Sequence, residues 1–192
     1  MACANDCILP VTADHPILVG VFDGFSWIRC EGKGSFLNSP VMKSFGDERI
    51  AAGEGLLVVD LAACTGMDST FMGTLAGMAA RLSAVEGGVL QIAEPGERNR
   101  RSLEDLGLDF LMEINPPAAV WRGRVDVIRA DLNPPQPLGG LGQNQRARHV
   151  LEAHQTLSGV SDKNAREFAN VVEMLKDQVS GKEESENKAS RD

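Results

Sequence analysis

The chain has 192 residues, of which 43% are hydrophobic and 24% are charged, and its formal net charge at pH 7 is −8. This is the composition of an ordinary globular protein, long enough for one domain with a sizeable core and an appendage. The excess of acidic side chains argues against direct binding to nucleic acid or to an anionic membrane surface, because both require clustered Lys and Arg.

No stretch of the sequence approaches the roughly 20 apolar residues of a membrane-spanning helix, so membrane insertion is not expected. The four cysteines, at positions 3, 7, 30 and 64, are too sparse for a disulfide framework. Reduced thiols and a cytoplasmic location are the simplest interpretation. Cys3 and Cys7 fall in an irregular N-terminal segment, residues 1–16, and lack the paired spacing of a zinc site.

Two short strands are predicted first, Ile17–Phe22 and Ser26–Cys30. Asp23-Gly24 between them is a strong hairpin signal. Asn38 followed by Pro40 then predicts the start of a helix, because Asn is a favoured cap and Pro is favoured in the first turn. The residues that this helix carries inward are Val41, Phe45 and Ile50.

The run Leu56–Leu61 is short, apolar on both faces and β-branched at two positions, as expected for a strand in a sheet covered on both sides. After a short turn, apolar residues recur at helical spacing from about Ser69 onward. The members of this stripe are Phe71, Leu75, Met78, Ala79 and Leu82. The pattern predicts a helix that packs one face against the sheet.

A buried strand at Val89–Ala93, a polar helix at Glu97–Leu106 and a last strand at Phe110–Ile114 complete the pattern. Strands that alternate with helices of this length imply βαβ units. The sequence therefore predicts an α/β fold for residues 17–132, with a central mixed, mainly parallel sheet of about four to five strands and helices packed on it.

The chain after Asn115 is rich in proline, and Val125–Ile128 could be a strand or an irregular wrap. Residues 133–142 have the Pro and Gly clusters of a flexible linker. Residues 143–180 then predict a helical hairpin extension. Its helices are Gln143–Leu157 and Asp162–Val179, with Gly159 as the stop and Ser161 or Asp162 as the second cap.

The apolar side of the predicted hairpin needs a surface to cover. In the first helix this side comprises Ala147, Val150, Leu151, His154 and Leu157, and in the second Ala165, Phe168, Val172, Leu175 and Val179. The hairpin can pack on the first domain, on another copy of the chain as a homodimer, or on a partner. The charged residues 181–192 predict a disordered tail.

The most informative segment is Met67-Asp68-Ser69-Thr70-Phe71-Met72, which follows the Leu56–Leu61 strand after a short turn and contains the start of the predicted helix. The first amide groups of a helix point outward without partners, and short oxygen-bearing side chains such as Asp68 and Ser69 are favoured there. The same place suits a phosphate group.

This strand, short loop and Asp68-Ser69-Thr70 triplet at a helix start resemble the STAS family, the domain of bacterial anti-sigma factor antagonists. The resemblance extends over roughly residues 18–115 and implies regulatory phosphorylation of Ser69, the serine directly after the aspartate. It also implies a cycle in which the unmodified protein binds an anti-sigma factor, a serine kinase acting on Ser69 releases it, and a serine phosphatase restores it.

The chain differs from the family pattern in two places. Phe71 and Met72 stand where the family has a glycine, and Gly73 comes later. Gly32-Lys33-Gly34-Ser35 replaces an acidic turn that helps to hold the partner kinase. The partner-binding residues that the resemblance implies are Met67, Asp68, Ser69, Thr70, Phe71 and Met72, with the Ser69 hydroxyl reachable from solvent.

Several other interpretations of these residues stay open. Asp68 and Ser69 could form a helix cap and nothing more, and Thr70 could be a second modification site or an ordinary first-turn residue. The domain could also be a constitutive scaffold in a transport or multi-protein assembly, without any phosphorylation switch.

Enzymatic, metal and cofactor chemistry find little support in the sequence. His149 and His154 are five residues apart, which places them on poorly matched faces of a helix for a shared metal ion. Cys64 has no histidine in the adjoining elements to activate it as a nucleophile. No catalytic residue, metal ligand or cofactor is therefore predicted.

Overall fold

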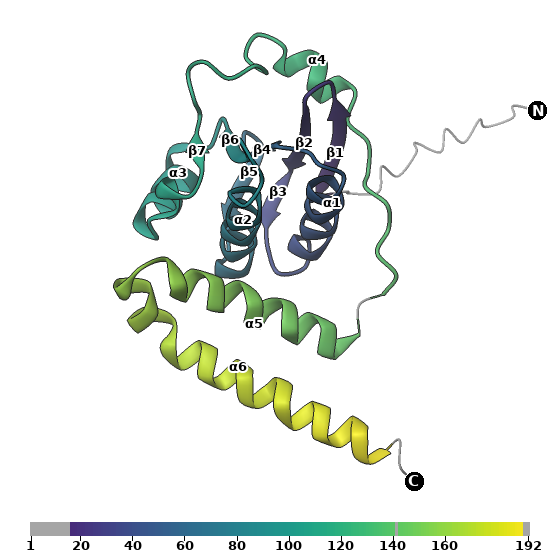
Figure 1. The fold of residues 1–192 in the computed structure, drawn as a ribbon, viewed down its shortest axis with the longest axis vertical. Coiled ribbons are helices and arrows are strands. Elements are labelled where there is room, and N and C mark those ends of the chain that lie inside the picture. Colours follow the sequence, from purple (N-terminus) through teal and green to yellow (C-terminus); the bar gives the residue numbers. More distant parts are fainter. Residues whose placement is uncertain (1–15, 141, 190–192) are drawn as a thin grey trace, which may run out of the picture.

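The computed structural model describes residues 16–140 and 142–189, so the predicted N-terminal segment, with Cys3 and Cys7, falls almost wholly outside the described residues. The main sheet has the order β1-β2-β4-β6-β7. Its strands are β1 (Ile17–Phe22), β2 (Phe25–Cys30), β4 (Leu56–Asp60), β6 (Val89–Ala93) and β7 (Glu113–Ile114). β1 is antiparallel to β2 and the other neighbouring pairs are parallel, which confirms the predicted α/β fold (Figure 1).

The first hairpin and the central strand follow from local sequence. Gly24 turns the β1–β2 hairpin with φ of +81°, a conformation that glycine adopts without a steric penalty. β4 is buried on both faces. Leu57 and Val59 belong to the larger of two clusters of buried apolar residues, here called the first core cluster. Val58 points to the other face of the sheet and belongs to the second core cluster, as the alternation of side chains along a strand requires.

Within residues 17–132, the helices that contribute to the first core cluster are α1 (Ser39–Ala51), α2 (Ser69–Leu82) and α3 (Glu97–Asp105). The whole predicted stripe of α2 is buried. In α1, Pro40 stands in the first turn, but Asn38 does not cap the helix with its side chain. Its Oδ1 accepts a hydrogen bond from the Ser35 amide at 2.8 Å instead. Met42 is fully buried, while Phe45 and Ile50 are only partly buried.

A second, small sheet pairs β3 (Gly32–Gly34) with β5 (Cys64–Met67) in parallel, and the sequence pattern did not predict it. Both strands are short and glycine-containing, so neither has the apolar alternation that indicates a strand. A Cβ at Gly34 would lie 2.9 Å from the ring of Phe71. The absence of a side chain at residue 34 therefore lets this small sheet lie against the first turn of α2.

The region after β6 differs from the predicted pattern. The expected strand at Phe110–Ile114 is a 3-10 turn (η1, Leu108–Phe110) followed by the two residues of β7. Val125–Ile128, which could have been a strand or a wrap, lies in a helix, α4 (Val125–Ala130). Ile128 and Trp121 pack with Trp27 in the second core cluster, so this region covers the face of the sheet opposite to α1 and α2.

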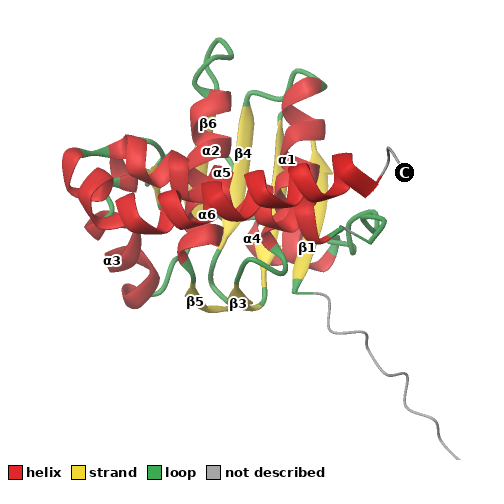
Figure 2. Ribbon diagram, turned by 90° about the horizontal axis from the view of Figure 1, so that it is seen from below, coloured by secondary structure: helices red, strands yellow, loops and turns green. Residues whose placement is uncertain are grey.

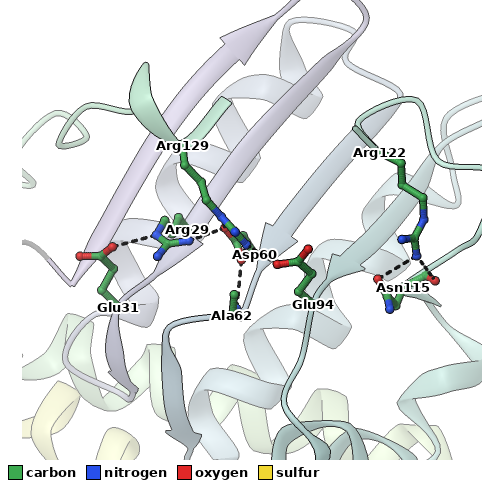
Figure 3. A network of polar contacts seen from close by, with 8 residues as sticks. All are labelled: Arg29, Glu31, Asp60, Ala62, Glu94, Asn115, Arg122 and Arg129. Atoms are coloured by element: carbon green, nitrogen blue, oxygen red, sulfur yellow. Dashed lines mark hydrogen bonds and ion pairs between the residues drawn. The ribbon is translucent and has the colours of Figure 1, made fainter. Parts of the chain in front are cut away.

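An ion-pair network around one buried carboxylate ties α4 to the ends of β2 and β4 (Figure 3). Asp60 has a fully buried carboxylate that accepts hydrogen bonds from Arg29 at 2.7 Å and from Arg129 at 2.8 and 2.9 Å. Burial alone would raise the pKa of Asp60, but hydrogen bonds from Arg129, the Ala62 amide and Arg29 outweigh it and hold the pKa below its ordinary value. Asp60 is therefore ionised and fully partnered.

The two C-terminal helices are present as predicted, with different ends: α5 (Gln143–Val160) and α6 (Asp162–Ala189). Gly159 does not stop the first helix. The break falls at Ser161, whose backbone is extended and whose Oγ accepts a hydrogen bond from the Asn164 amide at 3.2 Å. The helix α6 also continues to Ala189, where the charged sequence predicted disorder from Gly181 onward.

The hairpin lies on the main domain rather than apart from it. Figure 1 shows successive layers from α4 through the sheet to α1 and α2 and then to α5 and α6, and Figure 2 shows the hairpin crossing this layer of helices. α5 contacts α2 directly, while Leu157 of α5 and Phe168 of α6 join the first core cluster. In the described range, no helix is long and apolar enough to cross a membrane.

Candidate functional site

Asp68 fixes the junction between β5 and α2. It is the N-cap of the helix, with an extended backbone, and its Oδ1 accepts a hydrogen bond from the Phe71 amide at 2.8 Å. Its Oδ2 accepts another from the Phe36 amide at 2.9 Å. Both carboxylate oxygens therefore bind backbone, and Asp68 holds the loop after β3 against the start of α2.

Ser69, the first residue of α2, is half-buried and carries its hydroxyl toward α5. The Ser69 Oγ lies 2.9 Å from Nε2 of His154. The other ring nitrogen of His154, Nδ1, lies 2.8 Å from the carbonyl oxygen of Val150. Since a carbonyl only accepts, Nδ1 carries the proton, and in the neutral imidazole Nε2 accepts the Ser69 hydroxyl proton. Ser69 thus stands outside the core, covered on one side by α5.

The remaining predicted site residues differ in exposure. Met67 and Met72 are half-buried beside Ser69, and both pack against the first core cluster. Thr70 is 4% exposed and Phe71 is fully buried under Gly34. In this structure Thr70 and Phe71 therefore offer no surface to a partner, whereas Met67, Asp68, Ser69 and Met72 lie together at the start of α2.

An exposed apolar pair adjoins this cluster. Phe36 and Leu37 follow β3 and have exposed fractions of 46% and 67%. The backbone amide of Phe36 is the one held by Asp68, so the pair lies next to the start of α2. Large exposed apolar side chains beside a polar centre are typical of a protein-binding surface.

A second histidine joins α5 to both α1 and α2. Nε2 of His149 lies 2.8 Å from Oγ of Ser39 and 3.5 Å from Oγ1 of Thr74. Burial lowers the pKa of His149, which keeps the ring neutral at pH 7. His149 and His154 thus both face the domain as hydrogen-bonding partners of hydroxyl groups. Within the described residues, no group of three or more His, Cys, Asp and Glu could hold a metal ion.

The close approach of α5 to α2 depends on Gly73. A Cβ at this position would come within 2.7 Å of the carbonyl carbon of Ala153, so only glycine permits the contact. The cavity left between the two helices, lined by Gly73, Thr74, His149 and neighbours, holds about 10 Å³. That is room for one water molecule and not for a substrate.

The chemistry of this arrangement favours charge-controlled binding. A serine hydroxyl beside an imidazole is also the pair found in activated nucleophiles, but the one cavity described next to this helix contact is lined by neither Ser69 nor His154. A phosphate on Ser69 would lie at the N-terminus of a 14-residue helix, where backbone amides and the helix dipole favour negative charge.

The STAS domain family matches residues 17–119, which is more than half of the chain, and the protein belongs to this family. The match ends before α4, so the C-terminal hairpin lies outside it. No curated protein matches the chain.

Solved structures of low sequence identity resemble it in part. A putative anti-sigma factor antagonist from Thermotoga maritima is 19% identical, with a TM-score of 0.49 and coverage of 60% of this chain and 96% of the other. An anti-sigma factor antagonist from Mycobacterium paratuberculosis is 23% identical, with a TM-score of 0.47 and coverage of 59% and 92%. The unphosphorylated anti-sigma factor antagonist SpoIIAA is 19% identical, with a TM-score of 0.45 and coverage of 58% and 96%.

Sequence reasoning missed the role of His154. It placed this histidine among the apolar residues of a C-terminal helix and weighed it only as a metal ligand. The usable signal was the histidine itself, because a polar ring inside an apolar stripe requires a hydrogen-bond partner on the surface that the stripe covers. Which hydroxyl would supply that partner depends on how the hairpin packs.

Proposed function

We propose that this protein is a phosphorylation-controlled protein-binding module of the anti-sigma factor antagonist type, acting in the cytoplasm without catalytic activity of its own. The observation that carries the proposal is the placement of Ser69 at the first position of α2, outside the core, directly after a cap that holds the helix start in place. The partner is an anti-sigma factor with serine kinase activity, and a serine phosphatase reverses the modification.

The switch is local and electrostatic. The kinase transfers the terminal phosphoryl group of ATP to Oγ of Ser69; the bond to ADP breaks, and the hydroxyl proton passes to a base of the kinase. The product adds about −1.5 to −2 charges next to the Asp68 carboxylate. A partner that fits the bare hydroxyl then meets like-charge repulsion, while the domain itself need not refold.

The partner surface in this proposal consists of Met67, Asp68, Ser69 and Met72, with the neighbouring Phe36 and Leu37. Asp68 contributes by holding the helix start and the adjoining loop in register. The methionines supply adaptable apolar contact. Thr70 and Phe71 support this surface from beneath, since both are buried.

The test is the intact mass of the protein purified from the cells that make it, before and after phosphatase treatment. The proposal expects a phosphorylated fraction that maps to Ser69 and disappears with phosphatase. The matched control is Ser69→Ala expressed in the same cells, which should carry no phosphate at this peptide. Phosphate found only elsewhere in the chain, or none under any growth condition, would contradict the switch.

The hydrogen bond from Ser69 to His154 favours a second candidate function. In a constitutive scaffold, the serine would serve only to seat α5 on α2, and the hairpin would be a fixed part of the domain. Such a protein would show no phosphate on Ser69, and Ser69→Asp would leave partner binding unchanged.

A further inference from the structure

The hairpin covers the surface around Ser69 because α5 packs on one face of α2. Ser69, Gly73 and Gly77 are spaced at i, i+4 and i+8, which places them in one row along the helix. Ser69 bonds His154, Gly73 touches the backbone of Ala153, and a Cβ at Gly77 would lie 4.0 Å from Oγ1 of Thr156. The row therefore runs beneath α5 for two turns.

Further contacts hold the hairpin in place. The Asn164 side-chain amide, at the start of α6, donates to the carbonyl oxygen of Leu106 after α3 at 2.9 Å. Phe168 of α6 packs edge-on against the ring of His154, with 5.7 Å between ring centroids. The histidine that receives the Ser69 hydroxyl is thus backed by the second helix of the hairpin.

The sheet, helices α1 to α4 and the cap at Asp68 are all formed by residues that precede the hairpin. The family match also ends before it, at residue 119. The connection between them is the Pro/Gly stretch of residues 133–142, and most of its described residues are exposed. Because the strands of the main sheet pair with one another, departure of a hairpin attached in this way exposes Leu157, Phe168 and the surface beneath them but breaks no strand pair.

We propose that the α5–α6 hairpin is an intramolecular lid on the Ser69 surface, and that a partner or modifying enzyme engages Ser69 only after α5 leaves α2. Oγ of Ser69 lies 2.9 Å from Nε2 of His154, which leaves no space for a phosphoryl group between Oγ and the ring. A partner that uses this face must take the place of α5. The lid sets how much of the protein is competent to bind.

Thiol labelling tests the lid without any partner. Thr74→Cys, in a Cys3→Ser/Cys7→Ser background, places a thiol at a position that is 5% exposed beneath α5. Ala80→Cys gives an exposed reference on the same helix, and native Cys30 gives a fully buried reference in the core. Labelling by iodoacetamide is followed at each site by peptide mass.

Opening of the lid alone should label the thiol introduced at position 74 roughly tenfold or more faster than Cys30, yet more slowly than the thiol introduced at position 80. Labelling of position 74 at the same rate as Cys30 would mean that α5 leaves α2 only when the whole domain unfolds, and would overturn the proposal. This ratio is measured with the Ser69–His154 and Gly73–Ala153 contacts intact, so it decides the question even if a second substitution impairs folding.

The glycines of α2 provide a matched pair of further variants. Gly73→Ala adds a methyl group that collides with Ala153, although alanine itself favours the helix, so labelling at position 74 should rise roughly tenfold or more. Gly77→Ala has the same helix preference but meets only ordinary contacts at 3.5 and 4.0 Å, so labelling should change less than about twofold. Equal effects of the two substitutions would contradict a lid seated at Gly73.

A crosslink extends the test to modification and rests on the proposed function. Gly77→Cys/Thr156→Cys allows a disulfide between α2 and α5, because these positions face each other. The oxidised and reduced forms are incubated with ATP and an extract of the cells that make the protein, and phosphate on Ser69 is measured by peptide mass. The reduced form should gain roughly tenfold more phosphate than the oxidised form.

The outcomes of this second experiment separate the two proposals. Equal phosphorylation of the oxidised and reduced forms would overturn the lid and leave the phosphorylation switch standing. Absence of phosphate from both forms would count against the switch, while the labelling rates would still decide the lid.

Discussion

The protein has two polar centres that differ in how completely their groups are partnered. Asp60, at the end of β4, is a fully buried carboxylate held by Arg29, Arg129 and a backbone amide (Figure 3). Ser69, at the start of α2, is a half-buried neutral hydroxyl whose partner sits on the hairpin outside the family match. A buried charge cannot lose its partners without a large cost, whereas a hydroxyl can exchange His154 for water. The first centre is therefore structural, whereas the second has the exchangeable partner that the proposed switch requires.

The largest expected effect comes from breaking the Asp60 centre. Asp60→Ala leaves Arg29 and Arg129 without their shared carboxylate and should lower the free energy of unfolding by about 3–5 kcal/mol, measured by urea denaturation. The control is Glu94→Gln, which removes a partly exposed carboxylate that pairs with Arg129 at 2.7 Å and should cost less than about 1 kcal/mol. Similar losses for the two variants would remove the distinction between a structural network and surface pairing.

The next effect concerns binding at the Ser69 centre. Ser69→Asp should abolish association with the partner, which means a dissociation constant raised at least about tenfold, because it brings a second carboxylate next to Asp68. The far-UV circular dichroism should match that of the parent, since a negative charge is tolerated in the first turn of a helix. Ser69→Ala is the uncharged control and should keep binding. If Ser69→Asp binds as tightly as the parent, the charge switch is wrong.

Acidification tests how much the neutral form of His149 contributes to the free energy of unfolding. Because its pKa is lowered in the folded protein, the unfolded chain takes up this proton first as the pH falls below about 6.5. The stabilisation by neutral His149 is therefore complete above that pH and declines below it, by at most about 1.4 kcal/mol per pH unit. The charged groups that act on this ring are Lys43 on α1, Asp68 at the start of α2 and Glu152 on α5.

Urea midpoints measured between about pH 7.5 and 5 test this decline. His149→Gln keeps a hydrogen-bonding side chain but removes the titration, so its profile should be flatter over this range. Asp60 contributes to the pH dependence over a different, more acidic range. Its pKa is lowered in the folded protein, so the stability that its ionised form provides is lost only when the pH falls through that lowered pKa. Parallel profiles for the parent and His149→Gln would show that His149 is not responsible.

The smallest effect is the hydrogen bond between Ser69 and His154. A double-mutant cycle of Ser69→Ala and His154→Ala should give a coupling free energy of about 0.5–1.5 kcal/mol, the usual value for one neutral hydrogen bond. The cycle is measured from urea denaturation of all four proteins. A coupling free energy near zero would indicate that the other contacts of the hairpin, such as packing at Gly73 and the hydrogen bond from Asn164 to Leu106, hold it without this bond.

Much of the main domain could be predicted from sequence, because its signals are local. The apolar run Leu56–Leu61, the stripe from Phe71 to Leu82 and the hairpin at Asp23-Gly24 each fix an element through side-chain periodicity or turn chemistry. Asp68 was identified as a residue of the helix start for the same reason. The signal failed for β3, β5 and α4, since short segments and single turns have too few residues to show a period.

The sequence by itself determined that a serine follows the cap of α2 and that two amphipathic helices end the chain. Only the tertiary structure decided that α5 lies along α2, with His154 at Ser69 and Ala153 at Gly73. Periodicity marks which side of a helix is apolar but not which surface receives it. Which surface receives the apolar side depends on shape and on hydrogen-bond partners from distant parts of the chain. The sequence around Ser69 therefore could not predict whether this residue is exposed or covered by α5.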